Sequence, residues 1–432
     1  MKKIYQYILL VVAMVATASC SNELDDTLQP VNNGNLQFVV SDFPMFGEGT
    51  LTRAIGTQDE GKTAWENGDQ IIVTLISQKY GEQAAALTYD GSSWSTEASL
   101  SYLENETPSV SVFYAPCYEV TEEGTMQLRS GMQLGMTEYL SGNYEIENGI
   151  MTITFEGAIR TYSRLRIAGL ANQTLTVTTT DFTPAGATEV ATAAYTLTTD
   201  DNGNAFLYGV FAEDATISVK QGDITLKDYT FTVEKNPNGT EYNKSYALEA
   251  RPVIDGTLGG KTEATEDDIT ALVEQLKEYV DNGITTIIVP GSEPAMIDVG
   301  SLTITAIGEA IYRLSKEESY NGKIDLVLPD VTEIVDQEFY GARALNSINL
   351  PKVTTVGDGA FYDCQYLEEL TFGSVVTAIN HKLRAEFYKV GEKVEGCDLV
   401  LNREQVNAEA DYQPNIETST WWNTEWKSIT LK

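Results

Sequence analysis

The side chains that most often carry out catalysis are scarce or scattered in this sequence. His381 is the only histidine. Metal sites built on several histidines are therefore excluded, and at most one Ser-His or Cys-His catalytic arrangement could form. The tripeptide Gly-Lys-Ser does not occur, and among 63 acidic residues no carboxylate pair of the glycosidase kind stands out. We therefore expect no enzymatic activity, no cofactor and no metal site.

One acidic run, Asp200-Asp201-Asn202-Gly203-Asn204, has a faint likeness to a calcium loop. However, Ala205 stands where an EF-hand needs Gly, and Phe211 stands where it needs its bidentate Glu. The better interpretation is a hairpin turn at Asn202-Gly203. We expect three cysteines to be structural thiols, and the sequence leaves open whether they are free: Cys117, Cys364 and Cys397.

The charge balance narrows the classes of partner. The chain has 63 Asp and Glu against 28 Lys and Arg, a net charge of -35, so long-range repulsion opposes binding to a phosphate backbone. Nucleic acid is therefore excluded as an expected partner. Recurrent Thr, Tyr, Val and Asn-Gly turns favour a mainly β protein.

The elements that must position any functional side chain are clearest in residues 324–383, where apolar residues recur 22 positions apart (328, 350 and 372). A period of roughly 20–29 residues is typical of leucine-rich repeats, which bury their apolar faces by stacking on one another. The expected columns are Leu328, Leu350 and Phe372; Val331, Val353 and Val375; and Phe339, Phe361 and Leu383.

The segment from Val331 to Phe372, VTEIVDQEFYGARALNSINLPKVTTVGDGAFYDCQYLEELTF, resembles the BspA-like leucine-rich-repeat surface proteins of Gram-negative anaerobes. Side chains that point outward beside the repeat strands are expected to bind a ligand: Asn346, Asn349, Tyr366 and Glu369. The alternative is the same solenoid without a binding role.

Both ends of the solenoid have predicted caps. A helix capped by Thr265, with Asp268 at the capping-box position and Gly283 at its end, precedes a first repeat strand at Ile284–Pro290. Further strands are expected at 397–401 and 428–431. Aromatic sealing of the last open face is favoured over a tryptophan binding site for Trp421, Trp422 and Trp426.

The N-terminus reads as an export signal, with Lys2 and Lys3 before a short apolar run at Ile8–Ala16. Thr17-Ala18-Ser19-Cys20 resembles a bacterial lipobox, although Thr17 replaces the usual Leu. The resemblance implies acylation of Cys20 and a cell-surface outer-membrane lipoprotein, with the acidic run after Cys20 as its tether. Ordinary signal-peptidase cleavage is the alternative.

Three motifs carry a second resemblance: Thr52-Arg53-Ala54, Trp65-x-x-Gly68-Asp69-x-Ile71 and Tyr114-x-Pro116 are similar to those of the fimbrillin family of surface and pilus lipoproteins. The resemblance covers roughly residues 36–250 and implies two transthyretin-like sandwiches. It also implies proteolysis between Arg53 and Ala54, which would remove the first strand and open an edge to a strand from another subunit. Arg53 as a simple loop residue is the alternative.

The predicted fold is mainly β, with two tandem transthyretin-like β-sandwiches followed by a short leucine-rich-repeat solenoid that has one N-terminal capping helix. The expected boundaries are 1–19 for the signal peptide, 20–35 for the lipid-anchored acidic tether, 36–163 and 164–250 for the sandwiches, 251–264 for a linker and 265–432 for the repeats.

We therefore expect a surface-exposed outer-membrane lipoprotein that acts as an adhesin or a fimbrial tip or accessory subunit, with the repeats as its recognition surface. Its expected partners are a host protein or another cell surface, other fimbrial subunits by strand exchange, and the membrane through the lipid anchor alone. The alternative is a glycan-binding lipoprotein for nutrient capture. The sequence does not name the ligand, and it does not say whether the subunit polymerises, caps a pilus or stands alone.

Overall fold

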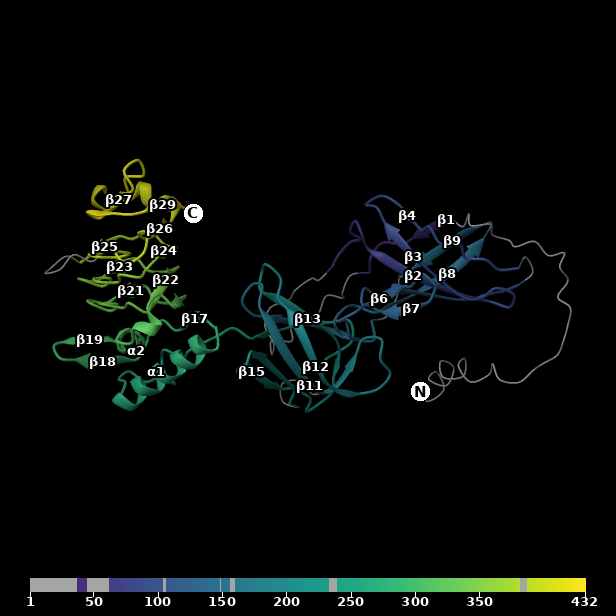
Figure 1. Ribbon diagram of the computed structural model, residues 1–432, viewed down its shortest axis with the longest axis horizontal. Coiled ribbons are helices and arrows are strands. Elements are labelled where there is room, and N and C mark those ends of the chain that lie inside the picture. The colour runs from purple at the N-terminus through teal and green to yellow at the C-terminus, as the bar shows by residue number, and fades with distance from the viewer. Residues whose placement is uncertain are drawn as a thin grey trace. The chain divides into compact units, whose positions relative to one another are not determined.

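A computed structural model describes residues 37–44, 62–103, 106–147, 149–155, 160–232, 239–380 and 387–432. Cys20, Arg53, Ala54, His381 and Leu383, all of which carried predictions, lie outside these ranges. The described chain is mainly β and forms two compact units, one containing β1 to β9 and the other β10 to β29 (Figure 1). No described helix has the length and apolar character needed to span a membrane.

The first unit is built on one curled sheet of seven strands, in the order β1-β9-β8-β5-β2-β3-β4. Its edge strands β1 and β4 approach each other, and the aromatic rings of Phe43, Trp65 and Tyr114 pack together beside the sheet. The strands are β1 (Gln37–Val40), β2 (Gln70–Ser77), β3 (Gly81–Tyr89), β4 (Trp94–Ser95), β5 (Ser109–Tyr114), β8 (Leu140–Glu147) and β9 (Ile150–Thr154), with β6 (Tyr118–Val120) and β7 (Met126–Leu128) as a separate pair.

The second unit begins with another seven-stranded sheet, in the order β15-β14-β11-β13-β10-β16 with β12 beside β11. Its core includes three phenylalanine rings. The centroid of Phe211 lies 4.4 Å from that of Phe182 and 4.6 Å from that of Phe231. The strands are β10 (Ser163–Ala168), β11 (Thr174–Pro184), β12 (Ala191–Thr198), β13 (Asn204–Phe211), β14 (Thr216–Gln221), β15 (Ile224–Thr230) and β16 (Ser245–Glu249).

The acidic run before β13 forms a tight turn. The Asp200 carboxylate accepts hydrogen bonds from the backbone N–H groups of Asn202 (2.9 Å) and Asn204 (2.8 Å). Gly203 has a φ of +80°, which a glycine adopts without strain. The predicted turn is confirmed, but β12 and β13 do not pair as a hairpin, because β12 pairs with β11 and β13 lies between β10 and β11.

The rest of the second unit, called here the repeat domain, contains a six-stranded parallel sheet in the order β17-β20-β22-β24-β26-β29. A smaller parallel sheet, β21-β23-β25, lies on the opposite side of each repeat (Figure 1). The strands are β17 (Thr286–Ile288), β20 (Ile324–Val327), β22 (Leu345–Leu350), β24 (Glu369–Phe372), β26 (Asp398–Leu401), β29 (Ser428–Leu431), β21 (Glu333–Ile334), β23 (Thr355–Val356) and β25 (Ala378–Ile379). The predicted strands at both ends are thus confirmed as β17, β26 and β29.

The predicted phenylalanine column exists, but its third member differs. Phe339 and Phe361 stack with centroids 5.7 Å apart, and Phe361 and Phe387 with centroids 5.8 Å apart. Phe387, 26 residues after Phe361 instead of 22, takes the third place in the column, and Leu383, predicted for that place, lies outside the described residues. Similarly, Val376, fully buried, takes the place predicted for the half-buried Val375, one residue earlier.

The tryptophans seal the end of the stack as predicted. The Trp421 and Trp426 rings lie 5.7 and 5.2 Å from the Phe387 ring, and both side chains are buried. Trp422 instead stacks on Tyr412, 5.2 Å away. The connecting elements are β27 (Thr420–Trp421) and β28 (Thr424–Glu425), with short 3-10 turns at Glu318–Tyr320, Arg403–Asn407 and Ala410–Tyr412.

The N-terminal cap of the repeat domain contains two helices, not the one predicted. In α1 (Glu266–Asp281) Thr265 and Asp268 form the expected capping box. The second helix, α2 (Ala306–Leu314), follows a hairpin of β18 (Met296–Val299) and β19 (Leu302–Thr305). Its buried residues Ile307, Ala310, Ile311 and Leu314 do have helical spacing, but the helix was missed because nine residues are too few to show a sustained helical period.

Residues 251–264, predicted to be a linker, are part of this cap. Burial alternates from Arg251 to Gly256 as along a strand, Val253 pairs with Ile288 of β17, and Glu263 pairs with Met296 of β18. Ile254 is fully buried in the core of the repeat domain. The linker prediction was wrong because it relied on the glycines of this segment and did not take account of its two-residue period.

Candidate functional site

The outward surface of the six-stranded parallel sheet, called here the sheet face, aligns its side chains in two rows. In each strand the inward residue joins a buried column that includes Leu326, Ile348, Leu370 and Leu399, so its neighbours point outward. The pairing registers place the outward residues in one row of Thr286, Asp325, Ser347, Glu369, Asp398 and Ser428, and a second row of Ile288, Val327, Asn349, Thr371, Val400 and Thr430.

The carboxylates of the first row are held by hydroxyl and amide donors. The Ser347 hydroxyl donates to Asp325 at 2.7 Å, and the Ser428 hydroxyl donates to Asp398 at 2.7 Å, each from the neighbouring strand. The Thr371 hydroxyl donates to Glu369 within its own strand at 3.0 Å. These bonds fix the orientation of three negative groups before any partner arrives, which lowers the entropic cost of binding.

The structure brings two of the four predicted ligand-binding residues onto the sheet face. Asn349 and Glu369 lie on adjacent strands, diagonal to each other, and both are exposed. Asn346 sits where the register shifts between β20 and β22, and its amide donates to Asp325 at 2.8 Å, so it supports the first row from the strand start. Tyr366 precedes β24 and lies beside Gly322, outside the two rows.

Sequence reasoning missed most of the face. Asp325, Ser347 and Asp398 share the first row with Glu369, but the prediction took outward neighbours from the two central strands only. The signal was present, because every outward position lies one residue from a column residue such as Leu326 or Leu399.

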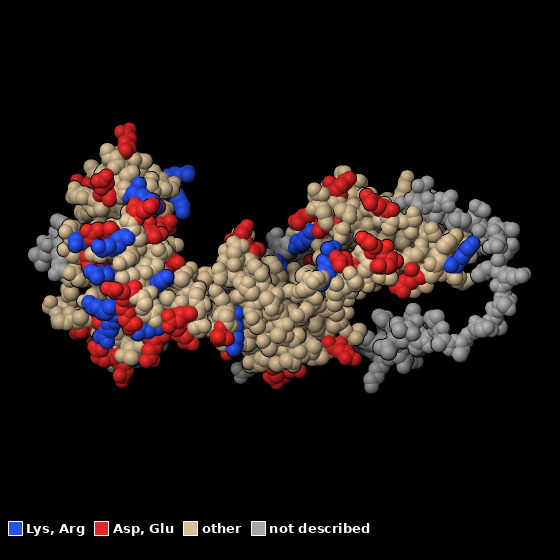
Figure 2. Space-filling view, in the orientation of Figure 1, with Lys and Arg blue, Asp and Glu red and all other residues tan. Residues whose placement is uncertain are grey.

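Charged side chains elsewhere on the repeat domain are paired with each other. Lys352 lies 2.8 Å from Asp330, and Arg343 lies 3.0 Å from Asp363, each linking one repeat to the next. In the view of Figure 2 Lys and Arg stand beside Asp and Glu over the repeat domain, while the visible surface of the second sheet is mainly uncharged. The two rows of the sheet face contain carboxylates and no Lys or Arg, although Lys427, next to the first row, lies 3.5 Å from the Asp398 carboxylate.

The residues that directly follow the column phenylalanines in the sequence are tyrosines, and they form a column of their own. The rings of Tyr340 and Tyr362 stack 5.2 Å apart, and those of Tyr362 and Tyr388 lie 4.9 Å apart. Their ring faces cover one another, so they do not form an open aromatic platform. This column was not predicted, although Tyr follows each Phe in the sequence.

None of the three described cysteines forms a disulfide, and all three are buried. Burial raises the pKa of the Cys364 and Cys397 thiols, which keeps them protonated and unreactive. The Cys364 thiol donates to the Phe339 carbonyl, 3.0 Å away. Within the described ranges no group of three or more His, Cys, Asp or Glu side chains is placed to hold a metal ion.

A comparison with protein families agrees with the repeat geometry. Residues 322–390 match the family described as BspA type Leucine rich repeat region (6 copies). One solved structure found is that of a Bacteroides fragilis protein whose name assigns it provisionally to cell adhesion. It has 11% sequence identity and a TM-score of 0.25, with 50% of this chain and 92% of that chain covered. The comparison with curated proteins finds no match.

Proposed function

We propose that this chain is a cell-surface adhesin whose repeat domain recognises a protein partner through the sheet face. The observation that carries the proposal is the register of the parallel strands, which aligns outward side chains of six strands in two rows. At about 4.8 Å between strands the face is about 25 Å long, enough to build an interface by summing contacts over several repeats.

The chemistry of the face favours a partner with a basic surface. Asp325, Glu369 and Asp398 contribute three carboxylates to one row, and the chain as a whole has a net charge of -35. Opposite charge on the partner would speed association and select it against other proteins. The match to BspA-type repeats supports a surface role for the same region.

The test is charge reversal on the sheet face of the otherwise complete chain. A Glu369→Lys/Asp398→Lys variant and a control variant, Glu274→Lys on the exposed side of α1, are compared with the wild type for binding to epithelial cells and to a panel of extracellular proteins. We expect the sheet-face variant to lose binding and the control to retain it. Equal binding by all three would refute the proposed surface.

The proposed attachment is a lipid on Cys20, supported by the charged start, the short apolar run and the small residues before this cysteine. A Cys20→Ser variant should leave the outer-membrane fraction, because one acylated N-terminus would be the anchor. Unchanged retention of the variant would count against lipidation.

We further propose that the two curled sheets are fimbrillin-like modules of the transthyretin type. Supporting this, β1 is a four-residue strand at the edge of its sheet, held in the ladder through β9. Cleavage between Arg53 and Ala54 would release β1 and free an edge of β9 for a strand from another subunit. Mass determination of the native N-terminus decides this, since a protein that always starts at Cys20 is not processed in this way.

The rival function, glycan capture, requires open aromatic platforms. In the first sheet Trp65 and Trp94 pack edge to face against each other, 5.0 Å apart, and Trp65 also contacts Phe43 and Tyr114. Their rings are therefore engaged in packing. Saturable binding of soluble oligosaccharides on a glycan array, unaffected by the sheet-face substitutions, would favour this rival.

A further inference from the structure

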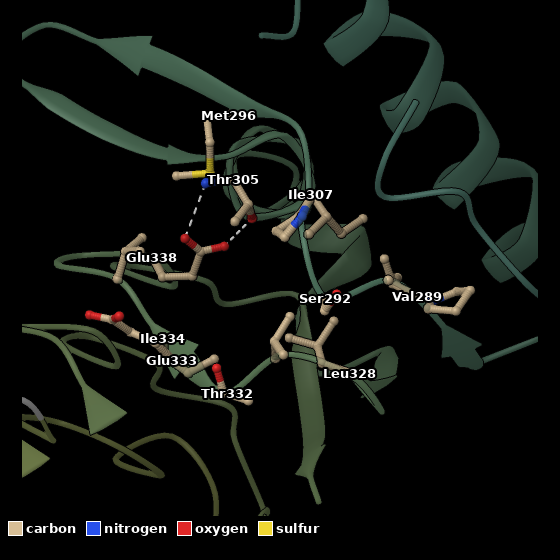
Figure 3. Close-up of a pocket in the computed structure, with 15 residues that line it drawn as sticks. Val289, Ser292, Met296, Thr305, Ile307, Leu328, Thr332, Glu333, Ile334 and Glu338 are labelled. Atoms are coloured by element: carbon tan, nitrogen blue, oxygen red, sulfur yellow. Dashed lines mark hydrogen bonds between the residues drawn. The ribbon is translucent and has the colours of Figure 1, made fainter. Parts of the chain in front are cut away.

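A pocket of about 220 Å³ lies in the repeat domain between its N-terminal cap and its first repeat. Three segments line it: residues 289–296 after β17, Thr305 and Ile307 at the start of α2, and residues 328–338 of the first return. Figure 3 shows side chains from all three segments facing one space, with Glu338 on one side and Ile307 and Leu328 on others. No part of the proposed adhesive face lines this pocket.

The notable group in the lining is the carboxylate of Glu338, whose side chain is 3% exposed. The Thr305 N–H donates to it at 3.1 Å, and the Thr305 hydroxyl donates to its other oxygen (Figure 3). Gly308 leaves space for it, since a Cβ there would lie 2.6 Å from the carboxylate oxygen. The carboxylate is therefore built into the pocket wall beside the N-terminus of α2.

Nothing in the pocket neutralises this group. The lining contains no Lys, Arg or His, and its second titratable side chain is another acid, Glu333. Nearby acids on the packed elements have their own partners: Arg313 bonds Glu309 at 2.6 Å, and Lys352 lies 2.8 Å from Asp330. In the described part of the chain no cation lies within ion-pair distance of Glu338, so its carboxylate, when ionised, has only the two Thr305 donors and no cationic partner.

The remaining walls are suited to an alkyl chain. Aliphatic surface comes from five lining residues, Val289, Ile307, Leu328, Val331 and Ile334, and it would favour the burial of methylene groups. The exposed residues Ser292 and Glu333 place polar groups at the outer end. A ligand that fits has a short aliphatic chain and a cationic end.

We propose that this pocket binds an alkylammonium group, with the ammonium ion-paired to Glu338 and the alkyl chain along the aliphatic wall. The group can come from a free primary amine or from the side chain of a lysine in another protein. Both sources present the same chemistry to the pocket, a charge-assisted hydrogen bond to a buried carboxylate. The inference does not depend on the adhesive role of the sheet face.

The proposal predicts a definite pH dependence. Desolvation raises the pKa of Glu338 to about 7, because burial disfavours the ionised form. An ammonium ligand binds the ionised carboxylate, so its affinity should rise between pH 6 and pH 8. A ligand held by the apolar wall alone would show no such rise.

The test uses the full chain and three probes, n-butylamine, Nα-acetyl-lysine N-methylamide and n-butanol as the uncharged analogue, in calorimetric titrations at pH 6 and pH 8. At pH 8 we expect saturable binding of at least one amine, about tenfold or more tighter than n-butanol. Stronger binding of the lysine derivative assigns the site to protein lysines, and stronger binding of n-butylamine assigns it to free amines.

Two variants complete the test. Glu338→Gln keeps an oxygen for the Thr305 N–H and gains an amide donor for the Thr305 hydroxyl, and it should bind the amines about tenfold more weakly. Ser292→Trp, at the exposed rim, should block entry without touching the carboxylate, so it serves if Glu338→Gln does not fold. Absence of saturable amine binding to the wild type at pH 8, or unchanged binding by the folded variants, would overturn the proposal.

Discussion

The buried side and the exposed side of each repeat carry different kinds of side chain along the solenoid. Inside, Phe339, Phe361 and Phe387 stack in a buried column that ends on Trp421 and Trp426. Outside, the first row of the sheet face carries polar and acidic side chains at the spacing of the strands, and the second row mixes polar side chains with Ile288, Val327 and Val400. The packing of the buried column depends on the shape and apolar area of its rings. The alignment of side chains on the sheet face depends only on the register of the strands.

Because of this difference, substitutions on the sheet face could change recognition without loss of the fold. A residue in the column contacts rings above and below, so its replacement leaves a cavity. A residue on the sheet face has solvent on one side, and its replacement leaves the column intact. If the sheet face is the recognition surface, as we propose, stability depends on the buried residues of the returns and strands, recognition depends on the outward residues of the strands, and substitutions can separate the two.

The largest expected effect is the loss of a ring from the buried column. Phe361 is fully buried between two rings, so Phe361→Ala should lower the free energy of unfolding of the repeat domain by about 3–5 kcal/mol. Urea denaturation followed by tryptophan fluorescence measures this, with Phe361→Leu as the milder control. A loss below about 1 kcal/mol would show that the column does not support the solenoid.

The next effect concerns the buried carboxyl of the cap. The pKa of Glu338 is raised to about 7 from 4.5 in the folded state, so the folded chain binds more protons than the unfolded chain between these values. Its stabilising contribution is therefore complete below the unfolded pKa and is lost as the pH rises through about 7. Between pH 4.5 and pH 8 the loss is on the order of 3 kcal/mol.

Glu338→Gln removes this titration, so its free energy of unfolding should fall less with rising pH than that of the wild type. Urea unfolding at several pH values compares the two proteins, and Glu333→Gln, at the exposed acid of the same pocket, is the control. Identical pH profiles for the wild type and Glu338→Gln would contradict the assignment.

A smaller effect is expected in the outer tyrosine column. Tyr362 lies between the rings of Tyr340 and Tyr388 but is only half-buried, so Tyr362→Ala should cost about 1 kcal/mol, well below the cost at Phe361. The same denaturation experiment gives the value. A cost equal to that of Phe361→Ala would blur the proposed division between the buried and exposed sides.

The sequence predicted what depends on a strict period and failed where the period breaks. Leu328, Leu350 and Phe372 were found because each step is 22 residues, and all three are buried. Phe387 was missed because it follows Phe361 by 26 residues instead of 22, and α2 was missed because its helical spacing extends over only nine residues. Ile254 was missed because glycines around it suggested a linker.

The candidate site was predicted in part for the same reason. Asn349 and Glu369 were placed correctly beside buried column residues, but Asn346 falls at a register shift that a repeat alignment does not show. The cross-strand bonds that orient Asp325 and Asp398 depend on which strands are neighbours. The pocket around Glu338 depends on how the cap packs on the first repeat, which no local pattern encodes.

We propose that the sheet face recognises the partner and that the buried phenylalanine column only supports the fold. The experiment that tests this compares cells that display the wild type, Glu369→Lys/Asp398→Lys or Glu274→Lys, and it measures both their adhesion and the thermal stability of each protein. We predict that the sheet-face variant stays folded, with a loss of about 1–3 kcal/mol from the two hydrogen bonds to Glu369 and Asp398, and loses adhesion, while Glu274→Lys keeps both stability and adhesion. Undiminished adhesion by the folded sheet-face variant would contradict the claim.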